Sequence, residues 1–257
     1  MPEAAQQCPA CHRSVRADTR FCPGCGQTLT ALEAPPHDDA IASRARFEKQ
    51  WVELKRVGWL FGLLLATSFV FGVALRSDRS PWPLVILSVA DAAIVLFASG
   101  MRYRKLLFLF QLRPSTQRDS VALVAMAIVF VTLASAYFWA LERLGVPFSS
   151  MTATFTRAGW PVWSMFLLIS VMPAVFEELA FRGVIQSSLE RILNARDAWL
   201  IQAALFSILH LSPLAFPSHF LMGLCFGYMR RRSRSIYPGM LLHACWNALV
   251  VFQELPA

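Results

Sequence analysis

Long apolar stretches separated by short connections dominate the chain from residue 57 onward. Seven stretches can be distinguished, and most approach the roughly 20 residues that a helix needs to cross a bilayer. Prolines between the fifth and sixth, which are short, indicate a tight or partly re-entrant connection. The pattern predicts an all-α polytopic membrane protein with about seven transmembrane helices. The stretches cover residues 57–75, 82–100, 120–141, 160–181, 198–211, 215–229 and 236–253.

Composition supports this interpretation. Of the 257 residues, 56% are hydrophobic and 16% charged, whereas about a quarter are charged in soluble domains. The net charge of +8 does not indicate nucleic-acid binding, because cytoplasmic loops of membrane proteins retain Lys and Arg. Counted between the stretches, these residues number 17 on one side and 4 on the other. We therefore expect an integral membrane protein in contact with the lipid bilayer, with its amino terminus in the cytoplasm.

The first 28 residues contain two CxxC pairs, Cys8/Cys11 and Cys22/Cys25, with glycine and proline at the turns. Such pairs bring four thiolates to tetrahedral spacing, and so short a segment builds no core without a metal. We predict a structural zinc ribbon over residues 1–28. A pair of disulfides is the alternative, and it would need an oxidising compartment. A cytoplasmic ribbon offers a surface for a protein partner and indicates a prokaryotic plasma membrane.

A polar, proline-containing segment follows the ribbon, and we interpret residues 29–43 as a flexible linker. Phe47, Trp51 and Leu54 then recur at helical spacing among basic residues, which predicts an interfacial helix over 44–56 leading into a helical bundle over 44–257. The start of the chain shows no apolar core with a cleavage site, so we expect no removable signal peptide.

Three charged residues interrupt the fourth stretch: Glu177, Glu178 and Arg182. Charge at membrane depth is costly and commonly marks function. On a helix Glu178 and Arg182 are four residues apart and can pair across one turn. Glu177 is then the carboxylate left for chemistry.

Two later apolar stretches carry polar residues that can join this set. His210 ends the fifth stretch, and His243 and Asn247 share one helical face in the seventh. Counted along antiparallel helices from their connecting turns, Glu177, His210 and His243 reach similar depths in the cytoplasmic half of the membrane. A carboxylate, two imidazoles and a carboxamide in one cavity would suit hydrolysis.

These residues form three motifs: Glu-Glu-x-x-x-Arg from Glu177, Phe-x-x-x-His ending at His210, and His-x-x-x-Asn from His243. Together they resemble the motifs of the CPBP family of intramembrane endopeptidases, which includes CAAX-prenyl proteases and bacteriocin-processing enzymes. The similarity covers about residues 160–253. It implies a protease core there, acting on membrane-associated, CAAX-like or other peptide substrates.

The resemblance also implies roles for the four residues. Glu177 would activate water with help from His210, and His243 with Asn247 would form an oxyanion site, with Glu178 and Arg182 in support. A variant makes Glu177, His210 and His243 the ligands of a catalytic zinc; the sequence slightly favours the metal-free form, because it lacks the His-Glu-x-x-His pattern.

Other interpretations of the polar residues remain open. His219 and Asp91 are expected to have structural roles, such as hydrogen bonds between helices. The alternative for the whole protein is a non-enzymatic membrane immunity or scaffold protein that recruits partners through its zinc ribbon. In that case the polar cluster only holds helices together.

Overall fold

The computed structural model describes residues 5–16, 22–27, 29, 37–77, 80–111, 117–147 and 150–255. The chain divides into two compact units, Met1–Lys49 and Gln50–Ala257. Residues 30–36 of the predicted linker lie outside the described residues. Residues 37–43, also predicted to be linker, are helical instead.

In the amino-terminal unit, strands β1 (Ala5–Gln7) and β2 (Ser14–Arg16) pair antiparallel, with Gln6 opposite Val15. The turns that carry the cysteines follow each strand. Buried Val15 packs with two of the cysteines and with Leu29, a very small apolar core. Leu29 was predicted to belong to the linker and instead packs against the ribbon.

Helix α1 runs without a break from His37 to Ser77, so the separate interfacial helix predicted over 44–56 does not exist. The polar amino-terminal part and the apolar part share one helix because no proline or glycine pair interrupts them. Four helical stretches are long and apolar enough to cross a membrane: Ser43–Val73, Trp82–Gly100, Asp119–Arg143 and Val162–Leu189. They confirm the predicted all-α membrane fold.

The remaining elements follow the predicted order. They are α2 (Trp82–Gly100), α3 (Tyr103–Leu106), η1 (Leu107–Phe110), α4 (Gln117–Arg143), α5 (Ala153–Arg157), α9 (Ala195–Leu209), α10 (Phe216–Ser233) and α11 (Tyr237–Glu254). Each of the seven predicted stretches is largely helical. Among the described residues, however, α9, α10 and α11 are not both long and apolar enough to count as membrane spans.

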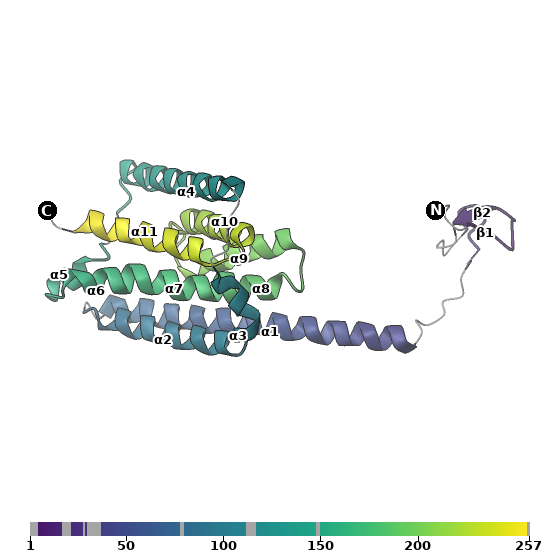
Figure 1. The fold of residues 1–257 in the computed structure, drawn as a ribbon, viewed down its shortest axis with the longest axis horizontal. Helices are drawn as coiled ribbons and strands as arrows, with labels where there is room; N and C mark the ends of the chain where they lie inside the picture. The colour runs from purple at the N-terminus through teal and green to yellow at the C-terminus, as the bar shows by residue number, and fades with distance from the viewer. Residues whose placement is uncertain are drawn as a thin grey trace. The chain divides into compact units, whose positions relative to one another are not determined.

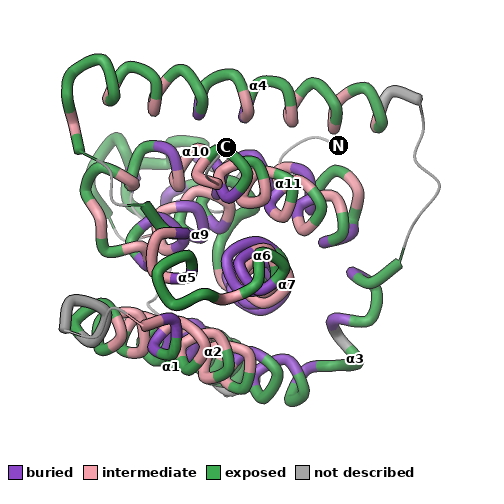
Figure 2. Tube along the Cα trace, turned by 90° about the vertical axis from the view of Figure 1, so that its left-hand side faces the viewer, coloured by how far each residue is buried: buried purple, intermediate pink, exposed green. Residues whose placement is uncertain are grey.

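Between α5 and α9 the chain forms a single helical rod of five consecutive parts. These are α6 (Val162–Met165), the π-helix η2 (Phe166–Val171), α7 (Met172–Glu178), the π-helix η3 (Leu179–Ile185) and α8 (Gln186–Leu189). In the end-on view of Figure 2 the rod lies inside a ring formed by α2, α9, α10 and α11, and its later part, η3 with α8, is buried throughout. The rod is therefore the centre of the bundle, with α4 outside α10 and α11 (Figures 1 and 2).

Helices α9 and α10 pack more closely than their neighbours because small residues face each other. A Cβ on Gly223 would lie 2.7 Å from the Cα of Ala203, the kind of close approach that small residues permit in membrane proteins. The buried Gln202 side chain donates to the carbonyls of Trp199 and Gly223. This interface fixes α9, and with it Phe206 and His210, against the rod.

Helices α1 and α2 are joined by a side-chain hydrogen bond within the apolar region. Thr67 Oγ1 donates to Asp91 Oδ1 at 2.7 Å. Asp91 therefore links two helices.

Candidate active site

The two glutamates lie at the end of α7, between two π-helical segments of the rod. Pro173 is the second residue of α7, and because proline has no N–H it leaves one carbonyl of the preceding turn without its backbone donor. Asn247 of α11 donates to a carbonyl of that turn: its Nδ2 lies 3.0 Å from Ile169 O. One turn earlier on α11, the Ala244 carbonyl accepts from Ser170 Oγ at 2.7 Å. These two bonds hold α11 against the rod beside the glutamates.

Glu178, Arg182 and His243 form a chain of buried contacts. Glu178 Oε1 lies 2.9 Å from Arg182 Nη1 and 3.3 Å from His243 Nδ1. The Glu178 and Arg182 side chains are fully buried, so each charge compensates the other in a medium of low polarity. Because a carboxylate only accepts hydrogen bonds, His243 Nδ1 is the donor. Glu178 thus fixes both the orientation and the tautomer of His243, the role that a second carboxylate has at many active sites.

Glu177 points to the other nitrogen of the same imidazole. Its Oε2 is 4.0 Å from His243 Nε2, and its side chain is 26% exposed. Yet Oε2 itself is buried and has no hydrogen-bond partner among the described residues. A buried acceptor without a partner is costly in a structural role. Glu177 therefore has the properties of a base that is free to bind a reactant.

Close packing fixes the position of Glu178. A Cβ on Gly239 of α11 would lie 2.8 Å from Glu178 Oε2. A larger residue at this position would displace the carboxylate and, through it, His243. The glycine lets α11 approach α7 closely enough for His243 to reach both glutamates.

The Phe206 ring lies beside four of the charged or ionisable groups. The Arg182 guanidinium carbon is 4.4 Å from its centroid, which is cation–π distance. The imidazoles of His210, His219 and His243 lie around the same ring, at centroid distances of 5.1, 6.2 and 6.1 Å. Phe206 thus separates His210 and His219 from the Glu178–His243 pair and packs against both groups.

His219 belongs to this cluster, although only a structural role was predicted for it from the sequence. Its ring centroid is 3.8 Å from that of His210. Each imidazole donates from Nδ1 to a carbonyl on its own helix: His210 to Phe206 at 2.9 Å, and His219 to Ala215 at 2.8 Å. Both therefore keep Nε2 as an acceptor. The signal in the sequence was a second histidine just beyond the proline-containing turn from His210.

The structure brings the predicted residues together to different degrees. Glu177, Glu178, Arg182 and His243 form one connected cluster, and His210 lies beside it across Phe206. Although both residues are described, no hydrogen bond or ion pair joins Glu177 to His210. Asn247 uses one amide hydrogen for the Ile169 carbonyl.

An apolar groove of about 770 Å³ opens between the rod and α11. Val171, Ala174 and Val175 of the rod line one side, and Met240, Leu241 and Ala244 of α11 line the other. The same two elements carry Glu177 and His243.

The four amino-terminal cysteines form a separate cluster whose geometry could hold a metal ion. Their Sγ atoms all lie within 4.8 Å of one another, with 3.6 Å between Cys8 and Cys25 and 3.5 Å between Cys11 and Cys22. These separations are too long for disulfides and fit the ~3.8 Å between sulfurs that a tetrahedral zinc with bonds of about 2.3 Å requires.

The amide of Gly24 prepares one of these thiols for a metal. It donates to Cys22 Sγ at 3.4 Å and lowers the pKa of Cys22 to about 6. Cys22 is therefore largely a thiolate at neutral pH, the form that binds metal. In the described part of the chain no other group of three His, Cys, Asp or Glu side chains comes as close together.

Residues 158–249 match the model of a protein family, that of the Type II CAAX prenyl endopeptidase Rce1-like proteins. This segment, just over a third of the chain, is similar to that family. The Rce1-like segment contains the rod from α6 to α8, helices α9 and α10, and most of α11, so it includes every residue of the central cluster. This match and the four candidate spans support an integral membrane protease of the CAAX type in general. No curated protein and no solved structure matches the chain.

Proposed function

We propose that the Rce1-like segment hydrolyses peptide bonds of membrane-associated substrates, with Glu177 as the general base. The supporting observation is the buried Glu177 Oε2, which has no hydrogen-bond partner and lies 4.0 Å from His243 Nε2. A water molecule bound there would give its proton to Glu177 while its oxygen attacks the peptide carbonyl. The substrate backbone would lie along the groove between the rod and α11, within reach of both residues.

The other polar residues have supporting roles in this proposal. With Nδ1 fixed by Glu178, a second proton on Nε2 would make His243 a donor to the oxyanion that forms on the carbonyl. Asn247 would contribute its remaining amide hydrogen. His210 would assist Glu177 across the pocket, and its contact with His219 would hold its ring in place.

Two further points are part of the same proposal. We infer that zinc occupies the Cys8/Cys11/Cys22/Cys25 cluster, because four thiolates at tetrahedral spacing are typical of structural zinc sites. We also infer that this ribbon lies in the cytoplasm, because basic residues gather on the side of the bundle to which the amino terminus belongs.

The decisive experiment compares the wild type with Glu177→Gln, reconstituted in liposomes, by proteomics of the membrane peptides that each releases. Glutamine keeps the size of the side chain and cannot accept a proton from water. We expect cleavage to disappear while insertion and thermal stability are retained. Persistent cleavage by Glu177→Gln would reject Glu177 as the base.

A second experiment separates the metal-free form from the zinc variant with Glu177, His210 and His243 as ligands. In the full chain with all four amino-terminal cysteines changed to serine, metal analysis reports only on the bundle. We expect activity without stoichiometric metal. One zinc per active chain, lost in His210→Gln, would favour the metal variant.

A further inference from the structure

A second pocket, which is polar, lies where the rod ends after α8. It has a volume of about 310 Å³ and is formed where three connections meet. Phe108 and Leu109 of η1 provide its apolar wall, and Glu190 follows α8. Arg230, Arg231 and Arg234 at the end of α10 provide its basic wall.

The pocket carries positive charge that the described residues do not neutralise. Glu190 pairs with Arg230 at 2.5 Å, so this carboxylate is already compensated. Arg231 donates only to a backbone carbonyl, that of Ala195, and Arg234 has no acidic partner in the described part of the chain. Two guanidinium charges therefore remain for a ligand.

Arg230 adds a buried donor that is not used. Its side chain is 8% exposed, and its Nη2 donates to Ser187 Oγ at 2.7 Å. Its Nε has no hydrogen-bond partner among the described residues. A buried N–H without an acceptor is costly, and an anion in the pocket would supply one.

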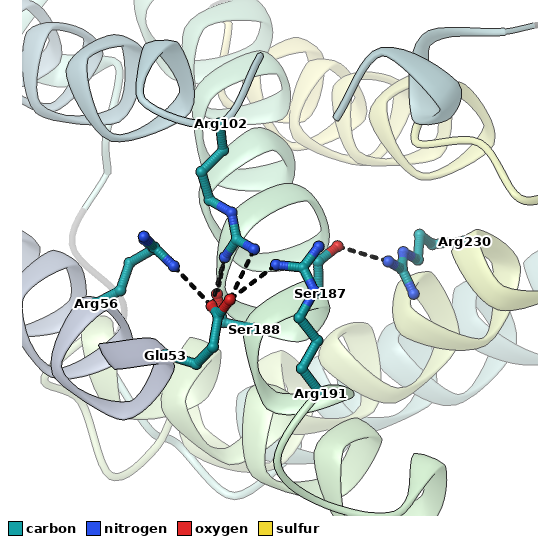
Figure 3. A network of polar contacts seen from close by, with 7 residues as sticks. All are labelled: Glu53, Arg56, Arg102, Ser187, Ser188, Arg191 and Arg230. Carbon is teal, nitrogen blue, oxygen red and sulfur yellow. Dashed lines mark hydrogen bonds and ion pairs between the residues drawn. The ribbon is translucent and has the colours of Figure 1, made fainter. Parts of the chain in front are cut away.

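A neighbouring network shows how this protein compensates arginines when their role is structural. In Figure 3, Glu53 accepts from Arg56, Arg102 and Arg191, and Arg102 also donates to Ser188. Both oxygens of the Glu53 carboxylate thus accept hydrogen bonds from arginines. The adjacent Ser187 bonds to Arg230 on the other side of the rod (Figure 3), where Arg231 and Arg234 have no such carboxylate.

The backbone at Arg234 indicates that its side chain matters. This residue has φ of +55°, the left-handed conformation, at the end of α10. Glycine is the usual residue there because a Cβ makes the conformation less favourable. An arginine at this position places its charge beside the pocket at a conformational cost.

The apolar wall indicates which anion fits. Segment η1 is held to the start of α11 by hydrogen bonds from Ser235 Oγ and Ile236 N to the Leu109 carbonyl. Leu107 and Phe108 are 56% and 41% exposed, as expected for a segment lying in the membrane interface. A cavity with an apolar rim and basic walls at this depth suits a lipid phosphate.

We propose that this pocket binds the phosphate of an anionic phospholipid at the face predicted to be cytoplasmic, where such lipids are enriched. A peptide carboxylate is disfavoured. Glu177 lies 13 residues before Glu190 along the rod, or ~20 Å at ~1.5 Å per residue, so a substrate would need about six extended residues beyond the cleaved bond to reach it. This lipid site does not depend on the proposed hydrolytic mechanism.

The test is native mass spectrometry of the detergent-solubilised full chain with palmitoyl-oleoyl phosphatidylglycerol or the matching phosphatidylcholine. The variant Arg231→Gln/Arg234→Gly removes both free charges, and the glycine also relieves the left-handed backbone. We expect the wild type to prefer phosphatidylglycerol by about tenfold or more, and the variant to bind it about 10- to 30-fold more weakly without losing thermal stability.

Arg232→Gln is the matched control, since Arg232 lies on the same turn but pairs with Asp119 at 2.7 Å and does not line the pocket. It should bind phosphatidylglycerol within about twofold of the wild type. The proposal would be overturned if Arg232→Gln lost as much phosphatidylglycerol binding as the double variant. It would also be overturned if the wild type bound both lipids equally. Displacement of the lipid by millimolar inorganic phosphate would assign the pocket to a soluble anion instead, and displacement by a peptide carboxylate would assign it to substrate.

Discussion

The bundle contains two clusters of charged side chains, and they differ in how far their hydrogen bonds are satisfied. Both oxygens of Glu53 accept from arginines, at the edge of the bundle. In the central cluster, Oε2 of Glu177 and of Glu178 and Nε of Arg182 have no hydrogen-bond partner among the described residues. Polar groups whose hydrogen bonds are all made within the protein hold helices together. Buried donors and acceptors without a partner can instead bind a reactant.

The comparison also separates two glutamates that are adjacent in sequence. Glu178 is fully buried, and its Oε1 contacts both Arg182 and His243. Glu177 is partly exposed and contacts only the second nitrogen of His243. We therefore expect Glu178 to behave like Glu53 when it is changed, and Glu177 to behave differently from both.

The largest effect is expected from Glu177→Ala. Loss of the general base should lower the turnover number by about 10²- to 10⁴-fold, while the melting temperature stays close to that of the wild type because no hydrogen bond is lost. Release of a cleavable peptide from liposomes, with circular dichroism melting, measures both. A large loss of stability with normal turnover per folded molecule would make Glu177 structural.

Glu178→Gln should mainly affect stability. It leaves Arg182 buried without a counter-charge, which typically costs about 3–5 kcal/mol, and it frees the His243 ring. Thermal unfolding in detergent measures the loss. Arg182→Met combined with Glu178→Gln removes both charges and should recover part of it; no recovery would show that the ion pair is not the origin of the effect.

Glu53→Gln provides the comparison at the edge of the bundle. It weakens contacts to three arginines, and because the Glu53 side chain is 12% exposed, we expect a smaller loss of about 1–3 kcal/mol. Turnover per folded molecule should stay within about twofold, since only structural contacts are lost. A specific loss of turnover would show that the two clusters are coupled.

Asn247→Ala sharpens the comparison within the active site. It removes the donor to the Ile169 carbonyl, at an expected cost of about 1–3 kcal/mol. Adding Pro173→Ala returns a backbone N–H to the turn that contains this carbonyl and should recover part of the stability. If turnover remains low in the stable double variant, Asn247 also contributes to the oxyanion site; recovery of turnover would limit it to a structural role.

The smallest effect on the bundle is expected from the ribbon. Cys22→Ser should abolish stoichiometric metal in the amino-terminal unit, because a structural zinc needs all four ligands. The melting transition of the bundle should change by less than about 0.5 kcal/mol, since the ribbon forms a compact unit of its own. A large shift would show that the two units stabilise each other.

The pattern of apolar stretches was sufficient to predict most of the helices. All seven predicted stretches are largely helical, and the second coincides with α2 at Trp82–Gly100. The linker and the interfacial helix were placed wrongly at the start of α1, because composition changes there without any residue that ends a helix. The two π-helical segments could not be predicted, since they depend on tertiary contacts rather than on local spacing.

For the active site, spacing along a helix predicted one contact that the structure contains. The Glu178–Arg182 pair follows from four residues of separation and is observed at 2.9 Å. The sequence indicated neither that Glu178 also holds His243 nor that His219 packs on His210. These contacts join residues far apart in the chain, and the rotation of each helix decides them.

The sequence alone therefore determined which segments are helical, which cysteines gather, and which polar residues lie inside apolar stretches, because these depend on residue type and local spacing. Only the tertiary structure decided which of two adjacent glutamates holds both Arg182 and His243 and which makes no hydrogen bond among the described residues. That difference depends on the close approach of α11 at Gly239 and on the bond that Asn247 makes to the Ile169 carbonyl.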